Sequence, residues 1–358
     1  MWRRPITLGR AVLAAVAVLG VAELGMRAID DHLPRATAGD TIEIELKFDQ
    51  LQALHDQGEP VDLVVLGNST LDAGVDPVLL GEESARYDAV YNAALLGQPL
   101  ASIRRWAGEF VLEEVDPDTV VLGLTPLDVP TLSIFGVSKP AVESAFEASF
   151  DALHPDALQR AEDNLSEHST LVRRRSAFRS PGELWRGITD TVYDRDKKFQ
   201  GDGPVTLEDG RQGVRDRQTW ETELLGPRGT NRTYWGYSYD GTTESRISAS
   251  ERQAYERSNL DRLQLAGVIS GIRDAGIDDI VVVLPPHDLP ALEMSGVPLA
   301  TYHRLADDLV GFAQDEDLAV IDLSAVAWDH TDFYDPAHLS RQGNERLTRL
   351  LADELDRL

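Results

Sequence analysis

The stretch from residue 61 to residue 70, VDLVVLGNST, sets the fold class expected for this chain. Its first seven residues form a nearly continuous apolar run ending in glycine, which is typical of a short strand buried on both faces of a sheet. Asn68, Ser69 and Thr70 follow at once, and Asn and Ser favour turns. We therefore expect a buried strand whose carboxyl end carries a serine.

Four further apolar segments of strand length follow along the chain, and helical patterns separate them. The expected strands are residues 88–94, 119–124, 279–284 and 318–323. The expected helices are residues 47–57, one starting at Asp76-Pro77, 99–114, 249–275, 302–315 and 341–358. Short apolar strands alternating with helices indicate a five-stranded parallel sheet covered by helices on both faces.

The alternation stops between residues 131 and 246. This segment has amphipathic pieces near 141–153 and 156–175, and then the Gly-rich, aromatic stretch LLGPRGTNRTYWGYSYDG, which favours loops or a hairpin. We interpret 131–246 as an insertion into an α/β core made of residues 41–130 and 247–358. Its aromatic residues either pack the insertion or stack on sugar rings; they include Trp220, Tyr234, Trp235, Tyr237 and Tyr239.

The N-terminal 40 residues have the pattern of an export signal. Three arginines precede an apolar run of twelve residues, 11–22, which is the length of a signal-peptide core. Extending the helix over residues 6–29 gives a length that can span a bilayer. We favour an uncleaved membrane anchor with its Arg-rich end in the cytoplasm, and a cleaved signal peptide is the alternative. Both interpretations place the rest of the chain outside the cytoplasm.

Composition excludes several classes of function. The formal net charge of −27 argues against a nucleic-acid partner, because phosphate binding needs clustered cations. The absence of cysteine excludes disulfides, thiolate metal sites and a cysteine nucleophile. Most of the histidines have no partner at ligand spacing, so we expect neither a metal nor a cofactor. His287 follows the fourth expected strand and either packs its loop or contacts substrate.

A second polar motif, Asp335-Pro336-Ala337-His338, lies just before the last expected helix, for which Ser340 is a suitable N-cap. An aspartate three residues before a histidine can accept a hydrogen bond from the imidazole Nδ1–H. This leaves Nε2 able to take a proton from a hydroxyl. In open α/β sheets functional residues lie beyond the carboxyl ends of the strands, where Ser69 is also expected. The two motifs together favour a catalytic function over two unrelated polar loops.

These motifs resemble two sequence blocks of the SGNH (GDSL-like) hydrolase superfamily. VVLGNST resembles the first block and YDPAHLSRQG the last, and the resemblance covers residues 60–130 and 247–358. It implies a flavodoxin-like, three-layer α/β/α sandwich with five parallel strands. It also implies that Ser69 is the nucleophile, His338 the general base and Asp335 its orienting partner.

The sequence departs from the superfamily pattern at the expected oxyanion hole. The usual Gly-Asp-Ser contains Asn68 in place of Asp, and the glycine of the second block corresponds best to Gly97. The third block normally carries an asparagine, which residues 123–128 (GLTPLD) lack; Thr125 is the candidate replacement. The resemblance therefore implies that Asn68, Gly97 and Thr125 contribute to oxyanion or substrate binding.

The missing asparagine, the N-terminal anchor and the large insertion are together similar to a membrane-anchored subset of this superfamily. Proteins of that subset work on teichoic-acid D-alanylation and on acetylation of exported polysaccharides such as alginate, alongside a multispanning membrane acyltransferase. The similarity implies a serine-dependent acyl-ester hydrolase or O-acyltransferase that acts outside the cytoplasmic membrane, with a carbohydrate ester as substrate. The alternative is a catalytically degenerate envelope scaffold or glycan-binding protein.

Overall fold

Five short apolar segments pair as the central sheet of the protein in a computed structural model. They are β1 (Leu63–Leu66), β2 (Val90–Asn92), β3 (Thr119–Gly123), β6 (Asp279–Leu284) and β7 (Ala319–Asp322). All neighbouring strands are parallel, in the order β2-β1-β3-β6-β7. The α/β class and the five-stranded parallel sheet expected from the sequence are confirmed. The structure describes residues 19–27, 41–127, 139–153, 169, 204–215, 217–236, 241 and 247–358.

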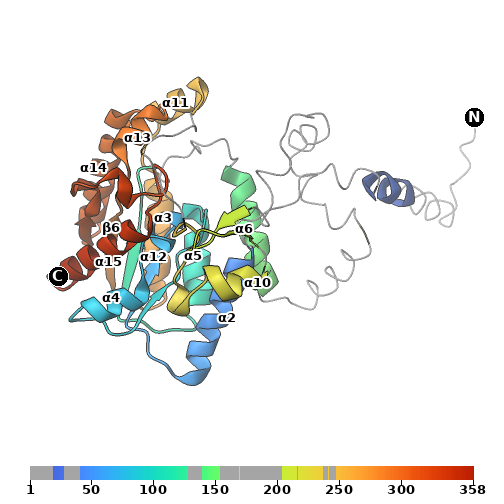
Figure 1. The fold of residues 1–358 in the computed structure, drawn as a ribbon, viewed down its shortest axis with the longest axis horizontal. Helices are drawn as coiled ribbons and strands as arrows, with labels where there is room; N and C mark the ends of the chain where they lie inside the picture. Colours follow the sequence, from blue (N-terminus) through green and yellow to red (C-terminus); the bar gives the residue numbers. More distant parts are fainter. Residues whose placement is uncertain are drawn as a thin grey trace, which may run out of the picture. The chain divides into compact units, whose positions relative to one another are not determined.

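The strands are apolar on both faces because helices cover both. Leu63, Val65 and Val121 point to one face, where their cluster includes Leu80 of α4 (Pro77–Glu83) and Leu347 of α15 (Arg341–Leu355). These two helices pack against each other (Figure 1). Residues between them in the strands, such as Val64 and Val120, are equally buried and point to the opposite face.

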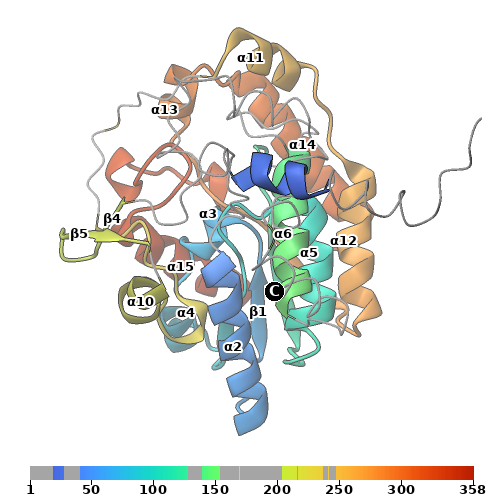
Figure 2. The same cartoon turned by 90° about the vertical axis from the view of Figure 1, so that its right-hand side faces the viewer.

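The second face is covered by α5 (Leu100–Trp106) and α12 (Arg262–Asp274), which pack side by side (Figure 2). The π-helical turn η2 (Ala107–Val111) continues α5, and Phe150 of α6 (Lys139–Leu153) stacks on Trp106 with ring centroids 5.6 Å apart. The described part of the chain also contains the helices α2 (Thr41–Gln57), α11 (Ala249–Glu256), α13 (Leu289–Met294) and α14 (Leu299–Asp315).

The prediction of one long helix over residues 249–275 is wrong. The structure divides it into α11 and α12, separated by residues 257–261. Asp261 caps the second helix, because its side chain accepts a hydrogen bond from the backbone N–H of Gln264 at 3.1 Å. Ser, Asn and Asp in the separating segment compete with the helical backbone for hydrogen bonds, which favours a break and a new N-cap there.

Chain contacts divide the protein into two units, one of residues 38–150 and 204–358 and the other of residues 1–37 and 151–203. The first unit therefore includes parts of the expected insertion. In it, β4 (Pro204–Thr206) and β5 (Gln212–Val214) form a separate antiparallel pair. Among the described residues, none between 131 and 246 adds a strand to the central sheet. A small second core joins Trp220 and Val205 to Leu46 of α2.

In the other unit the structure describes little beyond a helix at residues 19–27. There Glu23 accepts hydrogen bonds from Arg27 at 2.7 Å and from Ser169 at 2.8 Å. No helix within the described ranges is both long enough and apolar enough to cross a membrane. Residues 6–18 and 28–29 of the expected anchor lie outside those ranges.

Candidate active site

The structure brings Ser69, His338 and Asp335 together in one hydrogen-bonded chain. His338 Nε2 lies 2.8 Å from Ser69 Oγ. On the other side of the ring, Nδ1 lies 2.9 Å from Oδ1 and 2.8 Å from Oδ2 of Asp335. The distances are those of a nucleophile, a base and a carboxylate that orients the base. Residues 269 positions apart in sequence thus meet at the carboxyl edge of the sheet.

Ser69 is held in place by the turn that follows β1. Gly67 has φ +150°, and a Cβ at this position would lie 3.1 Å from the Gly123 carbonyl oxygen of the neighbouring strand, so the approach requires glycine. Asn68 is the N-cap of α3 (Ser69–Asp72), and its side-chain oxygen accepts from the Thr70 backbone N–H at 3.0 Å. Ser69 is therefore the first residue of a short capped helix.

The loop that carries Asp335 and His338 is anchored at both ends. Buried Asp332 accepts a hydrogen bond from Arg346 of α15 at 2.5 Å, and Ser340 caps α15 as expected. Gly343 allows α15 to approach the loop, because a Cβ there would lie 1.9 Å from the Asp332 carbonyl oxygen. Within the loop, Oδ1 of Asp335 accepts the backbone N–H groups of Ala337 at 2.8 Å and His338 at 2.9 Å.

Asp335 is suited to remain a carboxylate. Burial alone would raise its pKa, but the adjacent His338 and the two backbone N–H donors outweigh burial, and the pKa of Asp335 is lowered. An ionised Asp335 accepts the Nδ1–H of the imidazole and fixes the tautomer in which Nε2 faces Ser69. Asp335 is therefore suited to orient the ring of His338 toward Ser69.

Tyr234, from the expected insertion, covers the imidazole. Its ring stacks on His338 with centroids 4.4 Å apart and on Tyr334 with centroids 4.8 Å apart. Burial, and then the charge of Asp335, raise the pKa of Tyr234 well above its ordinary value, so it remains a neutral phenol. Sequence analysis placed Tyr234 in an aromatic group without a specific position; Tyr237 and Tyr239 of that group lie outside the described residues.

The three residues expected at the oxyanion or substrate site lie near this edge of the sheet. Gly97 is exposed, with φ +66°, in the loop after β2, and Leu95 of that loop donates to the Gly67 carbonyl at 3.2 Å. Thr125 follows β3 and is 1% exposed, and its hydroxyl oxygen accepts from Leu127 N at 3.2 Å. Leu66 pairs with Leu122 in neighbouring strands, and Ser69 and Thr125 each follow that pair by three residues in sequence.

A cluster of polar and charged residues that the sequence does not predict is buried behind Ser69. Lys47 of α2 donates to Asp72, the last residue of α3, at 2.6 Å and to the Ala94 carbonyl at 2.5 Å. Asn231 donates to Asp72 at 2.7 Å and to Glu43 at 3.0 Å. All four side chains are at most 1% exposed. The alternation of charge in α2 has the pattern of a solvated helix face, which conceals this burial from the sequence.

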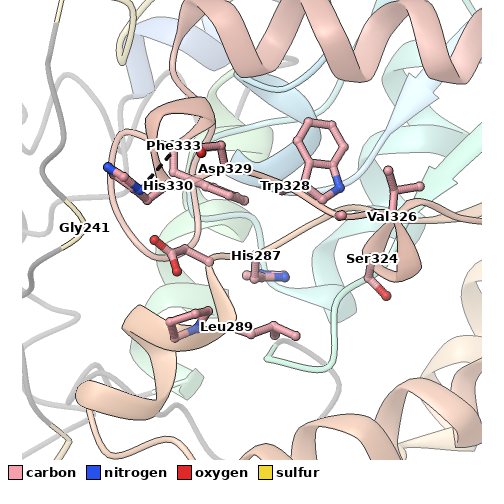
Figure 3. A pocket seen from close by; sticks show the side chains of 12 residues that line it. Gly241, His287, Leu289, Ser324, Val326, Trp328, Asp329, His330 and Phe333 are labelled. Atoms are coloured by element: carbon pink, nitrogen blue, oxygen red, sulfur yellow. Dashed lines mark ion pairs between the residues drawn. The ribbon is translucent and has the colours of Figure 1, made fainter.

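His287 is part of a pocket of about 550 Å³ that adjoins the loop of Asp335 and His338 (Figure 3). Asp288 and Leu289, which follow β6, and Val326, Trp328 and Phe333, which follow β7, also line it. The backbone N–H of Asp288 donates to the Pro336 carbonyl at 3.0 Å and so joins the pocket to the loop of Asp335 and His338.

His287 itself is buried and neutral. Its Nδ1 lies 2.8 Å from the Tyr302 hydroxyl, and its Nε2 has no hydrogen-bond partner among the described residues. Burial, and then the charge of His338, lower the pKa of His287 to about 3. The folded protein therefore does not protonate His287 at pH values where an unfolded chain would.

His287 should make the protein less stable in mild acid. Between pH about 6.5 and about 3 the unfolded chain binds a proton on His287 that the folded chain does not, so stability falls as the pH is lowered. We expect this contribution to change by about 1.4 kcal/mol per pH unit. His287→Asn, which can still bond Tyr302 but does not titrate, should show a shallower decline in urea unfolding between pH 6 and pH 4. Parallel profiles for the two proteins would contradict the assignment.

No protein-family model matches the sequence, and no curated protein matches it.

Proposed function

We propose that the protein is a serine-dependent acyl-ester hydrolase or O-acyltransferase of the SGNH type, in which Ser69, His338 and Asp335 form the catalytic triad. The observation that carries the proposal is the continuous hydrogen-bonded chain from Ser69 Oγ through the imidazole to the Asp335 carboxylate. The strand order of the sheet, second-first-third-fourth-fifth, is that of flavodoxin-like folds and supports the three-layer sandwich of this superfamily.

The reaction has two halves. In the first, Ser69 Oγ attacks the carbonyl carbon of the ester while its proton moves to His338 Nε2, and Asp335 stabilises the imidazolium. Collapse of the tetrahedral intermediate breaks the bond to the alcohol, which takes the proton from Nε2, and leaves the acyl group on Ser69. In the second half, His338 takes the proton of an acceptor hydroxyl, and the acceptor oxygen attacks the acyl-serine. The ester bond to Ser69 breaks, and His338 Nε2 returns the proton to Ser69 Oγ.

The oxyanion is bound, in this proposal, by the backbone N–H groups of Ser69 and Gly97 and by the Thr125 hydroxyl. Two observations support Gly97 as an oxyanion donor. Its positive φ favours glycine at this position, and the space beside it is open, since a Cβ there would meet no atom within 4 Å. Thr125 is supported by its place beyond β3, adjacent in the sheet to the strand before Ser69. Asn68 contributes by capping the nucleophile helix.

Thr125→Val tests the third donor, since valine keeps the shape and removes the hydroxyl. We expect kcat on a small acyl ester to fall about 100-fold with little change in KM, because the hydrogen bond matters mainly in the transition state. Thr119→Val is the matched control: Thr119 is buried at the other end of β3, where its hydroxyl donates to Asp279 at 2.9 Å. Unchanged kcat in Thr125→Val would leave a hole with two donors.

The acceptor is either water or a sugar hydroxyl, and we propose a carbohydrate of the cell envelope or an exported polysaccharide. The support is the export pattern of the N-terminus, which would anchor the chain through residues 6–29 with the catalytic unit outside the cytoplasm. A multispanning membrane acyltransferase is the partner that a transfer reaction would need.

The proposed function is tested by turnover of a small chromogenic acyl ester by the purified chain. Release of the alcohol by the wild type and not by Ser69→Ala is the expected result. Equal release by both proteins, on every ester tried, would favour the non-catalytic scaffold instead. Adding a hydroxylated glycan then separates the two acceptors, because only transfer yields an acylated glycan.

A further inference from the structure

The buried cluster behind Ser69 holds more acidic groups than cations. Glu43 and Asp72 are both acidic, and within the described cluster a single ammonium, that of Lys47, faces them. Burial, and then the charge of Glu43, raise the pKa of Asp72 well above its ordinary value despite Lys47. The raised pKa lets Asp72 hold a proton, which relieves the excess of negative charge. Burying these polar groups still costs stability, and well-packed apolar residues would often serve the fold as well. Stability alone therefore does not explain why these polar residues are buried here.

The cluster contacts two segments of the proposed active site, the helix that begins at Ser69 and the loop that contains Gly97. Asp72 is the last residue of the four-residue helix that begins at Ser69, and its backbone N–H donates to the Asn68 carbonyl at 2.9 Å, so Asp72 is joined directly to the turn that holds Ser69. Glu43 accepts the backbone N–H of Leu96 at 3.1 Å, and Lys47 donates to the Ala94 carbonyl. These two contacts fix the loop that presents Gly97.

Asn231 connects the same cluster to a third segment, the one that contains Tyr234. Its amide nitrogen bridges Asp72 and Glu43, and its amide oxygen accepts the backbone N–H of Thr233 at 2.8 Å. The next residue, Tyr234, stacks on His338. One buried cluster therefore spans the nucleophile helix, the loop of Gly97 and the segment that covers the catalytic base.

We propose that Glu43, Lys47, Asp72 and Asn231 are positioning residues, which set the distance between Ser69, the loop of Gly97 and His338 for the acyl transfer. This inference rests on the proposed function of the triad. Its physical basis is that several charge-assisted hydrogen bonds resist small displacements, whereas apolar contacts at the same place would tolerate sliding. Displacements near 1 Å at an active site can cost about 100-fold in rate.

Glu43→Gln separates positioning from stability. The variant removes one of the two buried acidic groups that share the Lys47 ammonium, so the melting temperature should be unchanged or higher. The glutamine has one acceptor oxygen for two donors, Leu96 N–H and the Asn231 amide, and one of these contacts must be lost. We expect kcat on a small acyl ester to fall about tenfold with KM within about twofold of the wild type.

Asn231→Leu and Thr348→Val complete the experiment. Asn231→Leu removes the bridge to both carboxylates and should lower kcat further at unchanged KM. Thr348 is equally buried and accepts from Asp76 N at 3.0 Å, between α4 and α15, so Thr348→Val should lose stability and retain kcat. If Glu43→Gln is folded and retains wild-type kcat, the positioning role is contradicted and the proposed function is unaffected. Absence of turnover in the wild type would instead contradict the proposed function, and the inference with it.

Discussion

Ser69→Ala and His338→Ala should each lower ester turnover by at least about 10⁴-fold, and the double variant should lose little more than either single one. The reason is the 2.8 Å contact between Ser69 Oγ and His338 Nε2, which makes the two groups one reacting unit. A serine without its base is a weak nucleophile, and a base without the serine has no proton to accept. Steady-state kinetics of the four proteins on one small ester measures this coupling.

Two nearby residues of the same types provide controls. Ser324 and His330 line the pocket beside the catalytic loop and take no part in the hydrogen-bonded chain of the triad. Ser324→Ala and His330→Ala should retain turnover within a few-fold. Additive losses in the Ser69 and His338 variants, or equal losses in the controls, would mean that the triad does not act as proposed.

Asp335→Asn should be nearly as damaging, by about 10²–10⁴-fold in kcat, although the base is still present. Two backbone N–H groups point at Oδ1 of Asp335, so they would hold the asparagine oxygen there. The amide NH₂ would then occupy the Oδ2 position, 2.8 Å from His338 Nδ1. Nδ1 would accept that hydrogen bond, and the ring proton would move to Nε2, facing Ser69. Such an imidazole cannot take the serine proton.

The control for this prediction is Asp329→Asn, which removes an acidic charge from the same stretch of chain. Asp329 caps the short helix at His330–Asp332, and asparagine is an equally good cap. Its turnover should stay within a few-fold of the wild type. A similar loss in both variants would assign the effect to charge and not to the tautomer of His338.

The α/β class was predictable because a buried parallel strand has a local signal in the sequence, a short run of apolar residues. Each expected strand overlaps an observed one, and β6 has the expected bounds of residues 279–284. The bounds of the helices were harder to predict than the strands, because capping residues compete with helix propensity. The helix ends before Ser258 and a new one begins after Asp261, inside a segment whose apolar periodicity continues.

The hydrogen-bonded contact between Ser69 and His338 was predictable because each residue lies next to a local sequence signal. Ser69 follows an apolar strand, and His338 precedes the helix that Ser340 caps. Tyr234 and the buried cluster were not predictable, since both depend on contacts between distant segments. Lys47 and Glu43 have the spacing of an exposed helical ion pair, and only the position of Asn231 and Asp72 around them makes that face interior. Buried charge has no pattern of its own in a single sequence.

The central claim, that Ser69 is a nucleophile activated by His338, is tested most directly by labelling with a fluorophosphonate probe. The probe forms a covalent bond only with an activated serine hydroxyl, and mass spectrometry of the digested protein identifies the residue that carries it. We expect a single adduct on Ser69 in the wild type, none in Ser69→Ala, and strongly slowed labelling in His338→Ala. Labelling that is absent from the wild type, or equal in the wild type and Ser69→Ala, would contradict the claim.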